Sequence, residues 1–376
     1  MNVVFINENT LGHASYLLPF VTHLEQHPEL GIQPLLLNAT PLPESLRAQA
    51  DRTIPGLRRF GLDLHSARWR RLVSRHVRRQ LDELRRQHRV DAVVVNTQSI
   101  ALALADLAPQ LPLFICLDAT FAQLARSRWF APNAVSRALL PVTLSPIRSR
   151  ERDLFRHAHR LLAWSEPVRE SLRQDYAISP ERIAILPPSL EIPPQRDTRR
   201  PPHRRPQILF VGGDFRRKGG LVLSETFRMH FAGSCDLHLV THSPIREEPG
   251  VFVHHGVRAR SAEWRRRWEE ADLFIFPSTL ETFGIVLIEA LAFQVPIISA
   301  DVGAARSILD QGSAGTLLPE VTRPALAREI KAILEHADHA RARADRGRQR
   351  ASDLFNLDTN TRQLATWLQA ATHNHL

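Results

Sequence analysis

The chain has few cysteines and no long hydrophobic run. Its only cysteines, Cys116 and Cys235, lie far apart within strand-like segments, so we expect two buried free thiols rather than a disulfide or a metal site. The apolar runs fall far short of the roughly 20 residues that a membrane-spanning helix requires. The opening residues, MNVVFIN, carry neither a charged leader nor a long apolar stretch. We therefore expect a cytoplasmic protein without a secretory signal.

Lysine is almost absent, although the chain is strongly basic. Lysine and arginine together number 49 against 39 acidic residues, a net charge of +10, yet only Lys218 and Lys331 are lysines and the other 47 are arginines. This charge favours anionic partners such as nucleic acid, acidic lipid or phosphorylated small molecules. Because arginine is used almost everywhere else, each remaining lysine is a candidate for a specific role.

Length and composition indicate two folded domains. At about 150 residues per domain, 376 residues predict roughly two. The hydrophobic share of 43% and the charged share of 23% are ordinary for a globular protein and exclude a disordered, collagen-like or coiled-coil chain. Seven prolines within residues 187–206 mark a break, because proline lacks a backbone donor and restricts the residue before it. We assign residues 1–190 to an N-terminal domain, 191–206 to a linker, 207–352 to a C-terminal domain and 353–376 to a helix that crosses back to the N-terminal domain.

Strand-like runs alternate with helical patterns in both halves. This alternation predicts the α/β class, with two doubly wound, Rossmann-like domains that face a cleft. In such folds, ligands bind at the carboxyl ends of the strands. The expected strands cover residues 3–6, 34–37, 92–95, 113–117 and 160–164, and then 208–211, 237–240, 251–254, 273–276 and 295–299. The expected helices include residues 13–26, 67–88, 221–231, 261–270 and 283–292, with more helix after Pro319.

A glycine-rich basic loop follows the first strand of the second half. Residues 210–220 read FVGGDFRRKGG, with Gly212 and Gly213 at the strand end and two more glycines at a helix start. Glycines allow a ligand to approach the backbone closely, and a helix N-terminus offers N–H groups to an anion. Arg217 and Lys218 would add two full charges, which suits a diphosphate. An ordinary basic surface turn is the alternative.

A second motif carries two glutamates. Residues 276–289 read FPSTLETFGIVLIE, in which Glu281 follows a strand and Glu289 lies within an apolar helical run. Burying a carboxylate in such a run is costly unless it has a partner, which indicates a role for Glu289. The backbone amides of Thr282, Phe283 and Gly284 open the same helix and can bind an anion. The alternative is a helix whose polar edge happens to carry Glu289.

Together these motifs resemble the family 4 glycosyltransferases. Residues 276–289 look like the family's E-x7-E motif, residues 212–220 are similar to its donor-phosphate loop, and residues 160–186 look like the end of its N-terminal domain. The resemblance implies the GT-B fold and a retaining glycosyltransferase that moves a sugar from a nucleotide-sugar donor to an acceptor hydroxyl, in glycan or glycolipid synthesis. It also implies that no cofactor and no metal are needed, because cationic side chains and amides can stabilise a leaving diphosphate.

The resemblance assigns roles to individual residues of the second half. It implies that Lys218, with Arg217, neutralises the diphosphate and that the amides of Thr282, Phe283 and Gly284 cap the same phosphates. Glu281 would contact the sugar and Glu289 the ribose hydroxyls. The family's most common loop has an arginine where this sequence has Gly213, so Arg216 or Arg217 would take its place. Residues 303–307 also depart from the family pattern, and we assign them no function.

The N-terminal half offers fewer candidates. Gly12 looks like the family's glycine that faces the donor, and Asp118 follows a strand end, where it could orient the acceptor hydroxyl or accept its proton. Capping of the next helix is an equal alternative for Asp118. His13 is a weaker candidate. The pairs His254–His255 and His157–His159 lack a completing cysteine or carboxylate, so we read them as structural or surface residues.

Other functions remain open at this point. Residues 68–89 carry nine arginines, and such a helix either exposes a solvated face or contacts the anionic inner face of a membrane. A GT-B sugar-nucleotide epimerase or phosphorylase would keep the fold and change the reaction. A basic nucleic-acid-binding protein is an alternative of another class. We expect no nucleic-acid partner, because no recognised binding motif occurs and aromatic residues make up only 7%.

Overall fold

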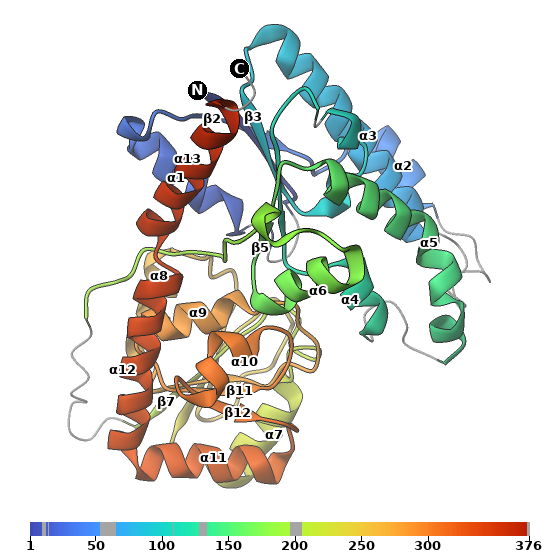
Figure 1. Cartoon of the computed structure of the whole chain (residues 1–376). Coiled ribbons are helices and arrows are strands. Elements are labelled where there is room, and N and C mark those ends of the chain that lie inside the picture. Colours follow the sequence, from blue (N-terminus) through green and yellow to red (C-terminus); the bar gives the residue numbers. More distant parts are fainter. Residues whose placement is uncertain are drawn as a thin grey trace. The chain divides into compact units, whose positions relative to one another are not determined.

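The computed structural model describes residues 1–9, 13, 15–52, 65–107, 109–127, 134–195 and 205–373, and it contains two compact units (Figure 1). Unit 1 consists of Met1–Ser189 together with Leu357–Leu376, and unit 2 is Leu190–Asn356. Each unit has its own parallel sheet and its own helices. The two are described separately below.

The sheet of unit 1 has six parallel strands in the order β2-β1-β3-β4-β5-β6. Helices cover both faces of a parallel sheet, so its central strands are apolar throughout, and every residue of β3 and β4 is buried. The strand order reverses at β1, because β2 pairs with one edge of β1 and β3 pairs with its other edge. The strands are β1 (Asn2–Asn7), β2 (Gln33–Asn38), β3 (Ala92–Asn96), β4 (Leu113–Leu117), β5 (Arg160–Ala163) and β6 (Ile183–Ile185).

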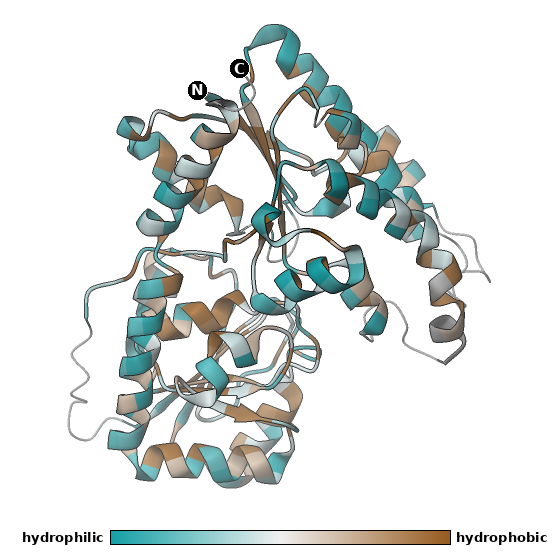
Figure 2. Cartoon of the chain, in the orientation of Figure 1, coloured by the Kyte–Doolittle hydropathy of each residue, from teal (hydrophilic) through white to brown (hydrophobic). Residues whose placement is uncertain are grey.

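The helices of unit 1 bury one face each. In α3, Val73, Val77 and Leu81 recur every four residues and are fully buried, while most of the helix is hydrophilic in Figure 2. The last helix, α13, packs on α1. The helices are α1 (Leu17–Gln26), α2 (Glu44–Asp51), α3 (His65–Gln87), α4 (Phe121–Arg126), α5 (Ala134–His157), α6 (Glu166–Tyr176) and α13 (Leu357–His373), with short 3₁₀ turns at Pro28–Leu30, Gln98–Ile100, Ala105–Leu107 and Pro180–Arg182.

The sheet of unit 2 has the strand order β12-β11-β10-β7-β8-β9, again all parallel. The strand order reverses between β7 and β10, so the loops that leave these two strands diverge from one point at the carboxyl edge. Doubly wound folds bind ligands at this point. The strands are β7 (Gln207–Val211), β8 (Asp236–Val240), β9 (Val251–His254), β10 (Leu273–Phe276), β11 (Ile297–Ala300) and β12 (Thr316–Leu318). The helices are α7 (Gly220–His230), α8 (Ala262–Glu270), α9 (Ile285–Ala292), α10 (Ala305–Ile308), α11 (Arg323–Glu335) and α12 (Ala337–Leu354), with a 3₁₀ turn at Asp310–Gly312.

The predicted α/β class is confirmed, and all ten expected strands are present. Two short edge strands, β6 and β12, and the long helix α5 were not predicted. The first helix begins at Leu17 rather than at residue 13. Cys116 and Cys235 are buried free thiols, as expected. Within the described residues, no helix combines the length and the apolar character that crossing a membrane requires.

Candidate functional site

The two predicted motifs of unit 2 meet at the point where its strand order reverses. Lys218 lies in the loop after β7, Glu281 lies in the loop after β10, and their side chains form an ion pair. The Lys218 side chain is 16% exposed and that of Glu281 is 13% exposed, so the pair is accessible to a small ligand although it is mostly covered by protein. Sixty-three residues separate the two in sequence, and the pairing of β7 with β10 brings them together.

The ammonium group of Lys218 lies in a desolvated setting. Its Nζ is 5.4 Å from the centre of the Phe276 ring, whose π face attracts a cation. Burial lowers the pKa of Lys218 from 10.5 to about 8, the positive charge of Arg217 acts in the same direction, and Asp214 opposes both. Lys218 is therefore still mainly protonated at pH 7, as a poorly hydrated cation suited to an anionic oxygen.

Two glycines of the basic loop, Gly219 and Gly220, lie where there is no room for a side chain. Gly219 has a φ of +78°, and a Cβ there would lie 1.9 Å from the carbonyl oxygen of Pro277. A Cβ on Gly220 would lie 2.3 Å from the Phe215 ring. These distances exclude a side chain at either position. Gly219 places the backbone of the basic loop directly against the loop after β10, and Gly220 leaves room for the Phe215 ring of the basic loop itself.

Arg217 joins the same two loops through hydrogen bonds. Its guanidinium donates a hydrogen bond to the carbonyl oxygen of Leu280 at 3.0 Å and lies 3.4 Å from the Asp214 carboxylate. Its own carbonyl oxygen accepts hydrogen bonds from both the amide and the hydroxyl of Thr279. Gly213 lies at the other end of the loop, where a Cβ would be 3.1 Å from the His242 ring.

Glu289 is the second carboxyl group of the predicted motif, and burial changes its pKa. Burial raises the pKa of Glu289 to about 7, while a hydrogen bond from the Trp264 side chain and the positive charge of Arg260 act to lower it. Arg260 has a φ of +67°, and Trp264 lies in the first turn of α8. Sequence reasoning found Glu289 but missed both partners, because neither Arg260 nor Trp264 stands in a motif of its own.

The residues before α9 form a tight turn rather than the first turn of the helix. The helix begins at Ile285, two residues later than predicted, and its N-cap Gly284 has a φ of +94°. The Phe283 ring is buried and packs edge-on against Phe355 at 6.5 Å. The carbonyl oxygen of Thr282 accepts a hydrogen bond from the amide of Ala304.

Gly303 packs against the backbone of this turn. A Cβ there would lie 2.6 Å from the carbonyl oxygens of both Glu281 and Thr282, so only glycine fits. Residues 303–307 received no function from the sequence. The structure shows that this stretch supports the loop that holds Glu281.

A second polar cluster lies at the carboxyl ends of the strands of unit 1. His13 Nε2 is 3.7 Å from the Asp118 carboxylate, and His13 Nδ1 is 3.4 Å from the side-chain oxygen of Asn96. Asn96 also donates a hydrogen bond to Asn7 at 3.0 Å. The cluster therefore joins His13, which follows β1, and Asp118, which follows β4, to the last residues of β1 and β3. His13 and Asp118 side chains are 17% and 16% exposed. Gly12, which the resemblance assigns to the loop that faces the donor, lies outside the described residues.

The alternative role for Asp118 as a helix cap is wrong. The N-cap of α4 is Thr120, whose hydroxyl accepts a hydrogen bond from the amide of Gln123, while the Gln123 side chain bonds back to the amide of Thr120. This reciprocal arrangement satisfies the helix start without Asp118. Asp118 lies beside His13 instead.

The histidine pairs considered from the sequence have other partners. His157 Nδ1 lies 2.7 Å from the carbonyl oxygen of Asp153, and His255 Nδ1 lies 3.0 Å from that of Thr241. His254 stacks on His238 with 3.0 Å between their ring nitrogens. These contacts agree with structural roles.

Comparison with known proteins identifies the family. Residues 12–192 match the model described as Glycosyltransferase Family 4, and residues 251–350 match the one described as Glycosyl transferases group 1. The chain belongs to the family 4, group 1 glycosyltransferases. The second match contains Glu281 and Glu289, and the first contains His13 and Asp118.

Several curated members of the family are similar to parts of this chain. The alpha-maltose-1-phosphate synthase of Mycolicibacterium smegmatis is 25% identical over 55% of this chain and 62% of its own length. The D-inositol 3-phosphate glycosyltransferase of Xylanimonas cellulosilytica is 28% identical over 62% of this chain and 65% of its own. The chain thus matches less than two thirds of the length of either relative.

Solved structures share the fold of this chain. Sucrose-phosphate synthase from Thermosynechococcus elongatus superimposes with a TM-score of 0.73 at 17% identity and covers both chains completely. Anabaena Alr3699/HepE, solved in complex with UDP and glucose, gives a TM-score of 0.64 at 17% identity over 98% of this chain and all of its own. These likenesses confirm the GT-B fold.

Proposed function

We propose that this protein is a retaining, metal-independent glycosyltransferase that moves a sugar from a nucleotide-sugar donor to an acceptor hydroxyl in glycan or glycolipid synthesis. The observation that carries the proposal is the Lys218–Glu281 pair at the strand reversal of unit 2. In a chain of the glycosyltransferase family, this pair would offer a cation to a phosphate and a carboxylate to a sugar hydroxyl.

The ion pair would exchange its partners when the donor binds. In the free protein, Lys218 and Glu281 neutralise one another. A donor diphosphate would take Lys218 as its counter-ion, and the sugar hydroxyls would then bond to Glu281. As the glycosidic bond breaks, negative charge builds up on the diphosphate, and a preorganised cation in a desolvated setting stabilises that charge.

The remaining donor contacts would fix the nucleotide. The Glu289 carboxylate would accept hydrogen bonds from the ribose hydroxyls, held in place by Trp264 and Arg260. The backbone amides of Thr282, Phe283 and Gly284 would bond to the phosphates. Arg217 would add positive charge while bracing the two loops through Leu280.

The acceptor would be activated by residues of unit 1. Asp118 would orient the acceptor hydroxyl or accept its proton, with His13 as its neighbour at 3.7 Å. The proton would leave the acceptor oxygen as that oxygen bonds to the anomeric carbon, while the diphosphate departs with the electron pair of the broken bond.

A donor screen tests this function most directly. UDP is the first nucleotide to test because Anabaena Alr3699/HepE has been solved with it. A thermal-shift series would compare UDP, GDP, ADP and their sugar conjugates. A true donor at 100 times its dissociation constant stabilises the fold by about 2.7 kcal/mol. Absence of any stabilisation by all six ligands would contradict the proposal.

Two further measurements separate the alternatives. An epimerase would convert the donor without an acceptor, whereas a transferase releases nucleoside diphosphate in proportion to the acceptor glycosylated. A nucleic-acid-binding protein would show tight, steeply salt-dependent filter binding and no stabilisation by nucleotides. Either result would replace the transferase proposal.

Peripheral membrane contact through residues 68–89 would depend on charge alone. The apolar face of α3 is buried in unit 1, so it is not available for insertion into lipid. Several of the arginines also have acidic partners, such as Arg78 with Asp82 and Asp106. Co-sedimentation with anionic vesicles over a salt series measures what attraction remains.

A further inference from the structure

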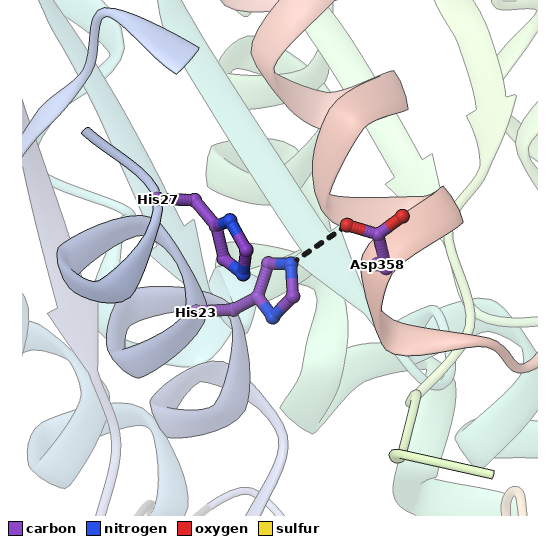
Figure 3. Close-up of side chains that lie close together, drawn as sticks. All are labelled: His23, His27 and Asp358. Atoms are coloured by element: carbon purple, nitrogen blue, oxygen red, sulfur yellow. Dashed lines mark hydrogen bonds and ion pairs between the residues drawn. The ribbon is translucent and has the colours of Figure 1, made fainter. Parts of the chain in front are cut away.

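A cluster of metal-binding side chains lies in unit 1, outside the sites described above. His23 on α1 and His27, which caps the end of that helix, lie one turn apart, and Asp358 reaches them from the first turn of α13 (Figure 3). Their ligand atoms all lie within 4.8 Å of one another. Of the His, Cys, Asp and Glu side chains that the structure describes, these three form the one group with this spacing.

The two imidazoles and the carboxylate lie close to one another. His23 Nε2 is 3.0 Å from Asp358 Oδ1, so without a metal this nitrogen carries a proton that it donates to the carboxylate and that a bound ion would displace. The planes of the two rings are tilted by 31°, with 4.2 Å between their centres. Histidines at positions i and i+4 of a helix lie on the same face, which is the spacing that zinc-binding helices use. A tetrahedral ion needs its ligand atoms about 3.3 Å apart, so the ligand atoms, which now lie within 4.8 Å of one another, would have to move closer when the ion binds.

A hydrogen bond to Glu29 prepares His27 as a ligand. The His27 Nδ1 lies 2.9 Å from the Glu29 carboxylate, so this nitrogen carries the proton and donates it. The lone pair is then on Nε2. Metal-binding histidines commonly donate their second ring nitrogen to a carboxylate in this way, which fixes the tautomer and makes the ligating nitrogen more basic.

A positive charge, that of Arg362, lies beside the cluster of His23, His27 and Asp358. The Arg362 guanidinium Nε lies 2.9 Å and 3.0 Å from the two oxygens of Asp358. Arg362 is therefore the cation that competes with a bound metal for this carboxylate. Arg362 also lies 3.8 Å from Glu29, so one cation faces two carboxylates.

We propose that His23 Nε2, His27 Nε2 and an oxygen of Asp358 form a binding site for a divalent transition metal of the Zn²⁺ type. Two imidazoles and one carboxylate favour this class over Mg²⁺ or Ca²⁺, which prefer oxygen ligands. A water molecule would complete a four-coordinate shell. The ion would join two helices whose ligands stand 335 residues apart in sequence, and its role would be structural. The proposal does not depend on the glycosyltransferase function.

Calorimetric titration of the full chain tests the site. The protein is treated with EDTA, desalted and titrated with ZnCl₂ and, separately, with MgCl₂. We expect one equivalent of Zn²⁺ to bind and to raise the melting temperature, with no comparable effect of Mg²⁺. His27→Gln should lose this equivalent or bind it at least about ten-fold more weakly. His27 is partly exposed, so the variant should fold, and its melting temperature without metal verifies this.

Two companion variants sharpen the result. His230→Gln removes an exposed histidine far from the cluster in sequence and should leave the equivalent in place. Arg362→Gln removes the competing cation and should bind Zn²⁺ at least as tightly as the original chain. Equal Zn²⁺ binding by His27→Gln and His230→Gln would overturn the proposal, as would loss of binding in Arg362→Gln with the fold intact.

Discussion

Lys218 and Glu281 are each other's counter-ion, although one follows the first strand of unit 2 and the other follows its fourth. The contact exists because β7 and β10 are neighbours in the sheet and both loops leave the same edge. Neither charge can therefore be removed without leaving the other uncompensated in a mostly buried position. The predictions below use matched variants to separate this effect from ligand binding.

Lys218→Ala should weaken nucleoside diphosphate binding by about 10- to 100-fold, the loss expected for one charge-assisted hydrogen bond of ~1.5–3 kcal/mol. Turnover should fall with it, because the charge is used in both ground and transition states. Calorimetry measures the affinity. The matched control is Lys331→Ala, which removes the other lysine of the chain, an exposed residue of α11. Unchanged affinity in Lys218→Ala would remove Lys218 from the site.

Diphosphate affinity should decline as the pH rises through 8. The pKa of Lys218 lies at about 8, so the ammonium is mainly protonated at pH 7 and mainly neutral at pH 9. The affinity of the original chain should drop about ten-fold over this interval. Lys218→Arg keeps its charge across the range and should show a much flatter profile. Parallel profiles for the two proteins would exclude Lys218 as the titrating group.

Glu281 and Glu289 should affect different kinetic constants. Glu289→Gln should mainly raise the donor KM, because the ribose is remote from the bond that breaks and its binding energy is the same in ground and transition states. Glu281→Gln should mainly lower kcat, by roughly 10²–10³-fold. Both replacements keep the side-chain shape, and melting temperatures detect any folding defect. Normal turnover of Glu281→Gln would show that the E-x7-E spacing is a coincidence.

Turnover should survive treatment with EDTA. The proposed mechanism stabilises the departing diphosphate with Lys218, Arg217 and backbone amides, so it needs no divalent ion. If the His23–His27–Asp358 site holds a metal, EDTA should lower the melting temperature without abolishing activity. Complete loss of turnover that Mg²⁺ restores is the result that contradicts this expectation.

Gly219→Ala should destabilise the protein by more than Gly233→Ala. Both glycines have a positive φ, of +78° and +86°, which costs a residue with a side chain about 1 kcal/mol or more. Only at Gly219 does the added Cβ also meet backbone, at 1.9 Å from the Pro277 carbonyl oxygen, whereas nothing lies within 4 Å at Gly233. Denaturant unfolding measures the difference. Equal losses would show that the two loops separate easily.

The sequence predicted elements and motifs well, but not the contacts between distant segments. The pattern of hydrophobic residues correctly predicted the strand before the basic loop and the strand before Glu281, because such a pattern depends only on residues close together in sequence. Strand order is a long-range property, so only the family resemblance assigned Lys218 and Glu281 to one donor site, and their ion pair was not predicted. Trp264 beside Glu289 lacked any local signal.

The partners of polar residues were difficult to predict from the sequence. The alternative that Asp118 caps a helix failed because Thr120, two residues later, forms a complete capping box. The histidine pairs that are close in sequence have other partners, in agreement with the structural roles expected for them. His23 and His27 lie beside Asp358, which no local pattern connects to them. Side chains from distant segments meet only once the topology is known.

Residues 357–373 form a helix that completes unit 1, with Leu364 and Leu368 fully buried, although all of unit 2 precedes it in the chain. A ribosome therefore delivers the whole of unit 2 before the last piece of unit 1 exists. Until then, the α1 surface that α13 covers stays open to solvent. This α1 surface therefore stays exposed throughout the synthesis of unit 2. In a fragment that stops at residue 189, it would stay exposed permanently.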